Sequence, residues 1–171
     1  NWSVFSDKAG PVIGPLMEFA LAAIRPKRVR DEEEALREEA KQILTRFGER
    51  LRVDTQVAPD CFGALVPSLI LQPLIENAIK YAVAPRIEGG HLCIEARREG
   101  AALVLRVSDD GPGIPDAIRD TLFYPMITGK EGGTGLGLSI AQNLIDQHKG
   151  RIDCISWPGH TEFTIYLPLR K

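Results

Sequence analysis

The sequence predicts an α+β fold, a two-layer α/β sandwich whose sheet is mixed and largely antiparallel. Two observations favour this class: some segments carry apolar residues at helical spacing, and short alternating runs follow one another directly, as in β-hairpins. Of the 171 residues, 44% are hydrophobic, which suits one compact domain with a genuine core. Helices combined with adjacent antiparallel strands pack well as one layer on a sheet.

A highly charged stretch at residues 25–39 indicates a boundary between an N-terminal helical segment, residues 1–48, and a main domain, residues 49–171. Two helices precede the main domain, one over residues 15–24 and one that ends before Gly48. These helices either pack on the main domain or are the remnant of a dimerising hairpin, which would make the chain a homodimer. No apolar run approaches the roughly 18 residues of a membrane span, so no membrane contact is expected.

Strands and helices alternate in the main domain. Pro67 suits the first turn of a long helix, and Gly89-Gly90 and Glu99-Gly100 mark turns at the ends of alternating runs. The expected elements are strand 51–57, helix 67–81, a hairpin of strands 92–98 and 103–107, helix 136–147, and strands 151–156 and 162–167.

Charge and cysteine content exclude several classes of function. The net charge of -2 and the pI of about 6.0 provide no basic field for nucleic acid or an anionic membrane, so no nucleic-acid partner is expected. The three cysteines are scattered and form no CxxC pair, which argues against both a disulfide framework and a zinc site. A reducing cytoplasm fits best, and the chain could be the cytoplasmic part of a larger sensor.

The segment Ile75-Glu76-Asn77-Ala78-Ile79-Lys80-Tyr81 is the first with chemical potential. Asn77, Lys80 and Tyr81 are three and four residues apart and share one face of a helix. An amide oxygen can ligate magnesium, an ammonium group can neutralise phosphate, and a tyrosine can flank a base. From this segment alone, an amphipathic helix with ordinary exposed polar residues is the simpler interpretation.

The second segment, residues 107–115, places Asp109 at the end of a strand, directly before a glycine-rich stretch. Glycines allow the backbone to approach a ligand closely, and a carboxylate there can accept a hydrogen bond from an adenine amino group. Asp, Gly and Pro are also the usual turn formers, so an ordinary turn is the alternative.

The third segment, residues 128–138, is a glycine-rich loop that runs into a helix. Exposed amides at a helix start, together with the helix dipole, favour phosphate binding without side-chain charge. The loop matches neither GxxxxGK[ST] nor GxGxxG. It is therefore either a mobile surface loop or a lid over a nucleotide.

The segments ENAIKY, DDGPGIP, FYPM and GTGLGLSIAQNLIDQHKG occur in this order. They resemble the asparagine, glycine, phenylalanine and second glycine boxes of bacterial sensor histidine kinases. The resemblance covers Leu69 to Leu169 and implies the Bergerat ATP-binding fold, shared with gyrase, the Hsp90 chaperone and MutL. ATP and Mg²⁺ are the cofactors that it implies.

The resemblance also implies roles for single residues. Asn77 would bind magnesium, Lys80 a phosphate and Tyr81 the base region, and Asp109 would accept the adenine amino group. The catalytic set would be Glu76, Asn77 and Lys80. The full nucleotide-binding set would be Asn77, Lys80, Tyr81, Asp109, Gly111, Gly113, Ile114, Lys130, Gly133, Thr134, Gly135, Leu136, Gly137, Leu138 and Thr161.

Several of these residues have distinct expected functions. The glycines would shape the pocket and lid, Lys130 would reach the terminal phosphates, and Thr161 would join a water network at adenine. Phe123 and Pro125 match the phenylalanine box, whose role is to anchor the lid to the core. Glu76 would either orient or deprotonate the phosphate acceptor, or simply support the helix surface.

The family's phosphoacceptor histidine has no counterpart among His91, His148 and His160, which lack its acidic helical context. A separate phosphoacceptor helical hairpin and a response regulator are therefore the expected partners, and the isolated chain should phosphorylate itself poorly. Fast ATP hydrolysis is not expected, because Pro73 lies one turn before Asn77, where hydrolysing relatives carry glutamate.

Two alternatives remain at this stage. One is a nucleotide-dependent regulatory module, such as an anti-sigma serine kinase or a pseudokinase, and the other is a gyrase-like or MutL-like motor, which Pro73 and the short lid disfavour. The similarity is also uneven along the chain. Residues 122–171 resemble nitrogen-regulation sensor kinases, whereas residues 46–85 resemble autolysin-type sensor kinases, so a mosaic origin is one interpretation.

Overall fold

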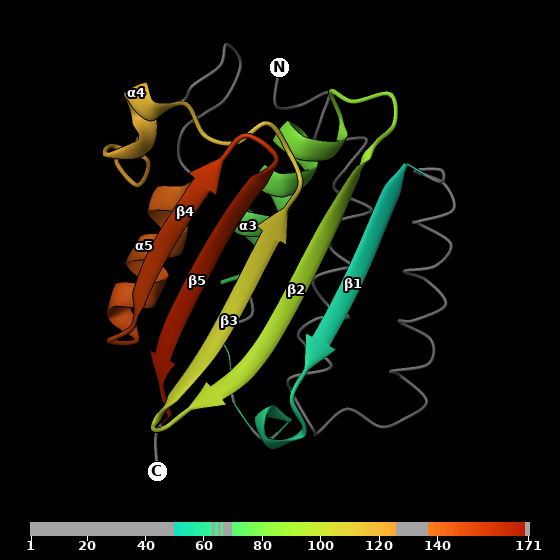
Figure 1. Ribbon diagram of the computed structural model, residues 1–171. Coiled ribbons are helices and arrows are strands. Elements are labelled where there is room, and N and C mark those ends of the chain that lie inside the picture. Colours follow the sequence, from blue (N-terminus) through green and yellow to red (C-terminus); the bar gives the residue numbers. More distant parts are fainter. Residues whose placement is uncertain (1–49, 63, 65, 67–69, 126–136, 170–171) are drawn as a thin grey trace.

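The computed structural model describes residues 50–62, 64, 66, 70–125 and 137–169. Within them the chain forms a five-stranded sheet with helices α3 (Gln72–Ala78) and α5 (Gly137–Gln147) on one face (Figure 1). The predicted α+β class is confirmed. The helices predicted within residues 1–48 lie outside the described residues, and no described helix has the length and apolarity that a bilayer span requires.

The sheet has the strand order β1-β2-β3-β5-β4. Strand β1 pairs with β2 in parallel, and all other neighbouring strands are antiparallel. A parallel pair needs a crossover connection, which here contains α3 and the helical turn η2 (Ile79–Val83). The strands are β1 (Leu51–Val57), β2 (Gly90–Glu99), β3 (Ala102–Asp109), β4 (Arg151–Trp157) and β5 (His160–Pro168).

Side chains alternate across the sheet between the helical layer and the outer face. In β2 the inward residues Leu92, Ile94 and Ala96 are buried, and the residues between them are partly exposed. The helices contribute Leu74 and Ile145 to the same core, and both are almost fully buried. Burial of this face of the sheet holds its register, because a one-residue slip would turn these side chains outward.

The helix that carries the first predicted site segment differs from the expectation in two ways. The predicted start, Pro67, lies outside the described residues. Ile70 and Leu71 form a bend, and α3 begins only at Gln72. Pro73 lies in the first turn, where its missing N–H removes no intrahelical hydrogen bond. After Ala78 the helix widens into the π-helical turn η2.

The π turn has an i to i+5 hydrogen bond, in which the Ala84 N–H donates to the Ile79 carbonyl at 2.9 Å. This turn was not predicted, because a single wide turn leaves no distinct hydrophobic period. Lys80 and Tyr81 lie inside this turn, so regular α-helical spacing does not describe their positions relative to Asn77.

The strand predictions are correct, and each observed end lies within two residues of its expected position. Two short helices, η1 (Pro59–Cys61) and α4 (Asp116–Arg119), were missed. Each is one turn or less, which is too short for a periodic pattern. Helix α4 follows Pro115 and leads the chain away from the end of β3 toward the predicted phenylalanine box.

Candidate nucleotide site

Asp109 is the last residue of β3 and lies opposite Thr161 of β5 in the strand register. Its Oδ1 accepts a hydrogen bond from the Gly111 N–H at 2.9 Å. Burial raises the pKa of Asp109 from its ordinary value of 3.8 to about 6, although the Gly111 N–H acts in the opposite direction. No side chain of another described residue donates a hydrogen bond to this carboxylate, which leaves it acceptor capacity for a ligand.

The glycine that follows Asp109 brings the strand end against the helical layer. A Cβ at Gly111 would lie 2.6 Å from the Cβ of Ala82 in η2, closer than real Cβ contacts occur. Only glycine fits there without displacing the neighbouring backbone. This close approach places Asp109 beside the helical segment that contains Lys80 and Tyr81.

A second group of contacts fixes the far side of the turn. Gly113 has φ +84°, and a Cβ at this position would lie 2.6 Å from the Trp157 carbonyl oxygen. The Ile114 N–H donates to Ser156 Oγ at 2.8 Å, and Ser156 Oγ lies 3.0 Å from Thr161 Oγ1. The buried Thr161 is therefore connected to the turn through Ser156.

Sequence reasoning missed Ser156 and Ala82. A serine in an alternating strand carries no signal of its own, and an alanine in a helix is unremarkable until a glycine is seen against it. Arg86, which donates to Asp110 within the same turn, was also missed, and so was the part that Asp110 plays there.

The helical wall carries Glu76, Asn77, Lys80 and Tyr81, all of them half-buried. Glu76 and Asn77 lie in the last turn of α3, and Lys80 and Tyr81 follow in η2. Lys80 Nζ lies 5.1 Å from the centroid of the Tyr81 ring, within the range of a cation–π contact. This wall therefore combines an amide, a cation and an aromatic ring.

The start of α5 forms a third wall. Gly137 is exposed, and a Cβ there would make ordinary contact with Pro73 Cβ at 3.7 Å, so the first turns of α5 and α3 are adjacent. Leu138 packs partly buried against the core. The remaining predicted lid residues, Lys130, Gly133, Thr134, Gly135 and Leu136, lie outside the described residues.

The segment before the lid is held by aromatic packing. Phe123 meets the buried Phe163 edge-on, with ring centroids 6.3 Å apart and an interplanar angle of 79°. Pro125 is exposed. Phe123 thus contacts the core, and its predicted function as an anchor for residues 128–136 stays a prediction, because those residues lie outside the described ones.

Two hollows formed by described residues lie elsewhere. One of 510 Å³ lies at the hairpin end of the sheet, near Glu99 and Pro168. Another, of 210 Å³, lies between Arg52 and Asp110. Neither is lined by the predicted nucleotide residues, whose expected cover, residues 128–136, is not among those described.

The histidines and cysteines have ordinary surroundings. His91 Nε2 lies 2.6 Å from Asp54 Oδ2, His148 Nδ1 lies 2.7 Å from the Leu144 carbonyl oxygen, and His160 stacks on Trp157. The three cysteines are free, and burial raises the pKa of each thiol, to about 12 for Cys154. Among the described residues, no group of three or more His, Cys, Asp or Glu side chains could hold a metal ion.

The chain is similar to known proteins in sequence and in fold. Residues 65–171 match the family described as histidine kinase-, DNA gyrase B-, and HSP90-like ATPase. The sensory histidine kinase/phosphatase NtrB of Escherichia coli O157:H7 is 52% identical over 112 residues, which are 60% of this chain and 31% of that protein. The alginate biosynthesis sensor protein KinB of Pseudomonas aeruginosa is 34% identical over 139 residues, 77% of this chain and 23% of that protein.

A solved structure has the same fold. The mycobacterial sensor histidine kinase MprB aligns with a TM-score of 0.62 at 22% identity, covering 81% of this chain and 95% of that one. The chain belongs to the histidine kinase-, DNA gyrase B-, and HSP90-like ATPase family. It is a catalytic ATP-binding domain of the sensor histidine kinase type, and it spans about a third of the length of the NtrB proteins that it matches.

These matches confirm the predicted family, and the NtrB matches agree with the similarity noted for residues 122–171. The similarity of residues 46–85 to autolysin-type kinases, and with it the mosaic origin, stays a prediction.

Proposed function

We propose that the chain binds Mg-ATP between the α3–η2 helix and the turn of residues 109–113, and that it transfers the γ-phosphate to a histidine outside this chain. The observation that carries the proposal is the Asp109 carboxylate, which is half-buried at a strand end and retains acceptor capacity. Perturbed titratable groups of this kind are characteristic of functional sites.

Asp109 has the chemistry to select adenine. With a pKa of about 6 it is mostly ionised at neutral pH, and a carboxylate accepts the hydrogen bond that the adenine amino group donates. Guanine has a carbonyl oxygen at the corresponding position, which would face the carboxylate as a second acceptor. The connected Ser156 and Thr161 hydroxyls offer further polar partners on the same side.

The residues present fit a magnesium ion bound mainly through phosphate. Mg²⁺ prefers oxygen ligands and usually keeps several waters and phosphate oxygens, so a single amide such as Asn77 is an adequate protein ligand. The metal would neutralise charge on the transferring phosphate. In the proposal Lys80 pairs with a phosphate, Tyr81 flanks the base, and Glu76 orients the acceptor or supports the helix.

The loop and the start of α5 complete the proposed site. Lys130 reaches the terminal phosphates, and the backbone from Gly133 through Thr134, Gly135 and Leu136 to Gly137 and Leu138 surrounds them. The support is the position of α5, whose first residue lies beside Pro73. Amides at a helix start favour anions.

The proposed partners are a phosphoacceptor helical hairpin and a response regulator. The NtrB relatives are named as sensory kinases, and this chain matches only part of them. In the proposal, residues 1–48 are a helical segment that dimerises or packs on the domain of residues 49–171. A cytoplasmic location follows from the need for ATP.

Calorimetric titration with Mg-AMPPNP tests the nucleotide site. Asp109→Asn should weaken binding about 10- to 100-fold, because a hydrogen bond to a charged group is lost. Asp153→Asn is the control, since this exposed carboxylate lies on β4 and pairs only loosely with Arg151 at 3.5 Å. A folded parent chain that does not bind AMPPNP would overturn the proposal.

A second experiment tests the transfer. The chain is mixed with radiolabelled ATP and a phosphoacceptor hairpin from a related histidine kinase. Label that is lost in acid indicates phosphohistidine and supports the proposal. Acid-stable label on serine would instead support the regulatory alternative.

A further inference from the structure

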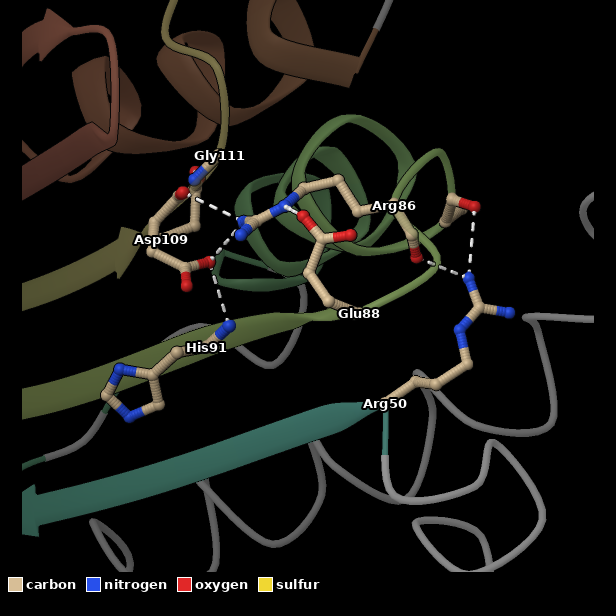
Figure 2. A network of polar contacts seen from close by, with 8 residues as sticks. Arg50, Arg86, Glu88, His91, Asp109 and Gly111 are labelled. Atoms are coloured by element: carbon tan, nitrogen blue, oxygen red, sulfur yellow. Dashed lines mark hydrogen bonds and ion pairs between the residues drawn. The ribbon is translucent and has the colours of Figure 1, made fainter.

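Arg86 lies in the loop between η2 and β2 and reaches the turn that follows Asp109 (Figure 2). Its Nη1 donates to the Asp110 carbonyl oxygen at 2.9 Å and to Asp110 Oδ1 at 3.0 Å. Two hydrogen bonds from one guanidinium to the backbone and the side chain of a single residue restrict both groups at once. We call this pair the Arg86–Asp110 clamp.

Asp110 is also held from the sheet. Its Oδ1 accepts a hydrogen bond from the His91 N–H at 2.9 Å, at the start of β2. Asp110 lies between Asp109 and Gly111 in the chain, so its position fixes the backbone from which the Asp109 carboxylate projects. The clamp therefore acts on the turn itself rather than on a distant surface.

The backbone of Arg86 is itself held by Arg50, the residue before β1. Its carbonyl oxygen accepts a hydrogen bond from Arg50 Nη2 at 2.7 Å, just before β1 (Figure 2). Its Nε donates to Glu88 Oε1 at 2.9 Å, but Glu88 is mostly exposed and that ion pair adds little. The Arg86 side chain itself is only 30% exposed, which strengthens its bonds to Asp110.

We propose that Arg86 is a positioning residue for the nucleotide site, holding through Asp110 the turn that presents Asp109 to adenine. The proposal rests on the proposed function of Asp109. Arg86 contacts no nucleotide in this account. Its contribution is the order that it imposes on residues 109–111 before the nucleotide binds, which lowers the entropic cost of binding.

The effect can be separated from a simple charge effect. Three charged groups act on the pKa of Asp109: Asp110 raises it, whereas His160 and Arg86 lower it. Loss of Arg86 and loss of Asp110 therefore move this pKa in opposite directions. If the clamp positions the turn, both losses weaken binding at pH 8, where Asp109 is ionised in either case.

The test uses Mg-AMPPNP titrations of the whole chain at pH 8. Arg86→Ala and Asp110→Ala should each raise Kd about 5- to 20-fold. The Kd of the double variant should not exceed the higher of the two single-variant values, because either change alone already breaks the Arg86–Asp110 clamp. Arg86→Lys keeps the charge but lacks the planar guanidinium whose Nη1 reaches both Asp110 oxygens, and it should recover part of the affinity.

Arg97→Ala is the matched control. Like the pair of Arg86 with Glu88, Arg97 pairs with a glutamate two residues later, from its Nε to Glu99 Oε1 at 2.7 Å. Arg97 lies at the hairpin end of β2. Its Kd should stay within about twofold of the parent value. A folded Arg86→Ala variant that binds as tightly as Arg97→Ala would overturn the proposal.

An amide measurement without nucleotide separates failure of this proposal from failure of the proposed function. The Gly111 N–H donates to Asp109 Oδ1, so its hydrogen exchange reports on the order of the turn. Arg86→Ala should accelerate that exchange at least fivefold, and Arg97→Ala should not.

If the parent chain fails to bind AMPPNP, the proposed nucleotide site is wrong, and the Arg86–Asp110 clamp is judged by the exchange of the Gly111 amide alone. If Arg86→Ala does not fold, Arg86→Lys decides by the same two measurements, and parent-like values in both would overturn the proposal.

Discussion

Gly111 and Ala82 touch across the boundary between the sheet and the helical layer. The position of a Cβ on Gly111 would be 2.6 Å from Ala82 Cβ and 2.8 Å from Asp109 Oδ1. Neither neighbour can withdraw easily, because Ala82 is in the buried π turn and Asp109 is at the end of β3. The distance between the proposed adenine acceptor and the helical wall thus depends on the absence of one side chain.

Gly111→Ala should therefore destabilise the chain. Overpacking of this kind costs about 1 to 3 kcal/mol, and we expect the free energy of unfolding in urea to fall by that amount. The control is Gly137→Ala, where the added methyl group makes ordinary contact at 3.7 Å and replaces a glycine at a helix start. That change should be neutral or slightly stabilising. Equal losses in both variants would contradict the close packing at Gly111.

Asp109→Asn should stabilise the nucleotide-free chain at pH 8. Burial raises the pKa of Asp109 from 3.8 to about 6, so the folded state binds its proton more tightly than the unfolded state does. This contribution to stability is present below pH 4 and is lost as the pH rises through about 6. At pH 8 the parent must keep a partly buried charge that the variant lacks.

The expected gain at pH 8 is about 1 to 3 kcal/mol in the free energy of unfolding. Urea denaturation at pH 8, 6 and 4 checks it, and the difference between variant and parent should shrink as the pH falls. A difference that does not change across this range would show that Asp109 titrates normally.

Ser156→Ala tests the connection between the turn and β5. The change leaves the Ile114 N–H and the Thr161 hydroxyl without their shared partner, which costs about 1 to 2 kcal/mol of stability. Ser108→Ala is the matched control, because Ser108 lies on β3, on the other side of β5 from β4, and faces the outer side of the sheet. Thermal unfolding of both variants should show a lower Tm only for Ser156→Ala.

Arg106→Ala addresses the outer face of the sheet. Arg106 lies 3.1 Å from Glu95 and 3.2 Å from Glu162, and Glu162 is only 15% exposed. Its loss leaves Glu95 without this cation, whereas Glu162 keeps the Thr164 hydroxyl at 3.2 Å and His160 at 3.4 Å, and the change should cost about 1 to 2 kcal/mol at pH 7. Nucleotide affinity should stay unchanged, because this face is opposite the helical layer. A Kd for Mg-AMPPNP more than threefold weaker would show that the two faces are coupled.

The strands were predictable because alternation in a half-buried sheet is written directly into the sequence. The residues from Leu92 to Ala96 alternate between buried and partly exposed, and the two hairpin strands appeared within two residues of their expected ends. The place of Asp109 at a strand end and the close backbone approach at the glycines after it were predictable from the residue types alone, whereas the roles expected of these residues toward a nucleotide stay predictions.

The supporting residues were not predictable for a physical reason. Ala82, Arg86 and Ser156 function through contacts with residues about 25 to 45 positions away in sequence, and nothing local distinguishes them. The late start of α3 was also missed, because apolar residues before Pro73 fit a helix and a buried bend equally well.

The π turn at residues 79–83 accommodates one more residue than an α-helical turn does. A five-residue π turn winds the chain through about the same angle as a four-residue α-helical turn, so removal of a single residue there would restore regular geometry and leave Asn77 in nearly its present direction relative to the loop that carries Arg86. The removal would instead change which side chains stand at the positions of Lys80 and Tyr81. Among related chains, a one-residue length difference within this turn would therefore alter the proposed phosphate and base contacts while it leaves the proposed magnesium ligand in place.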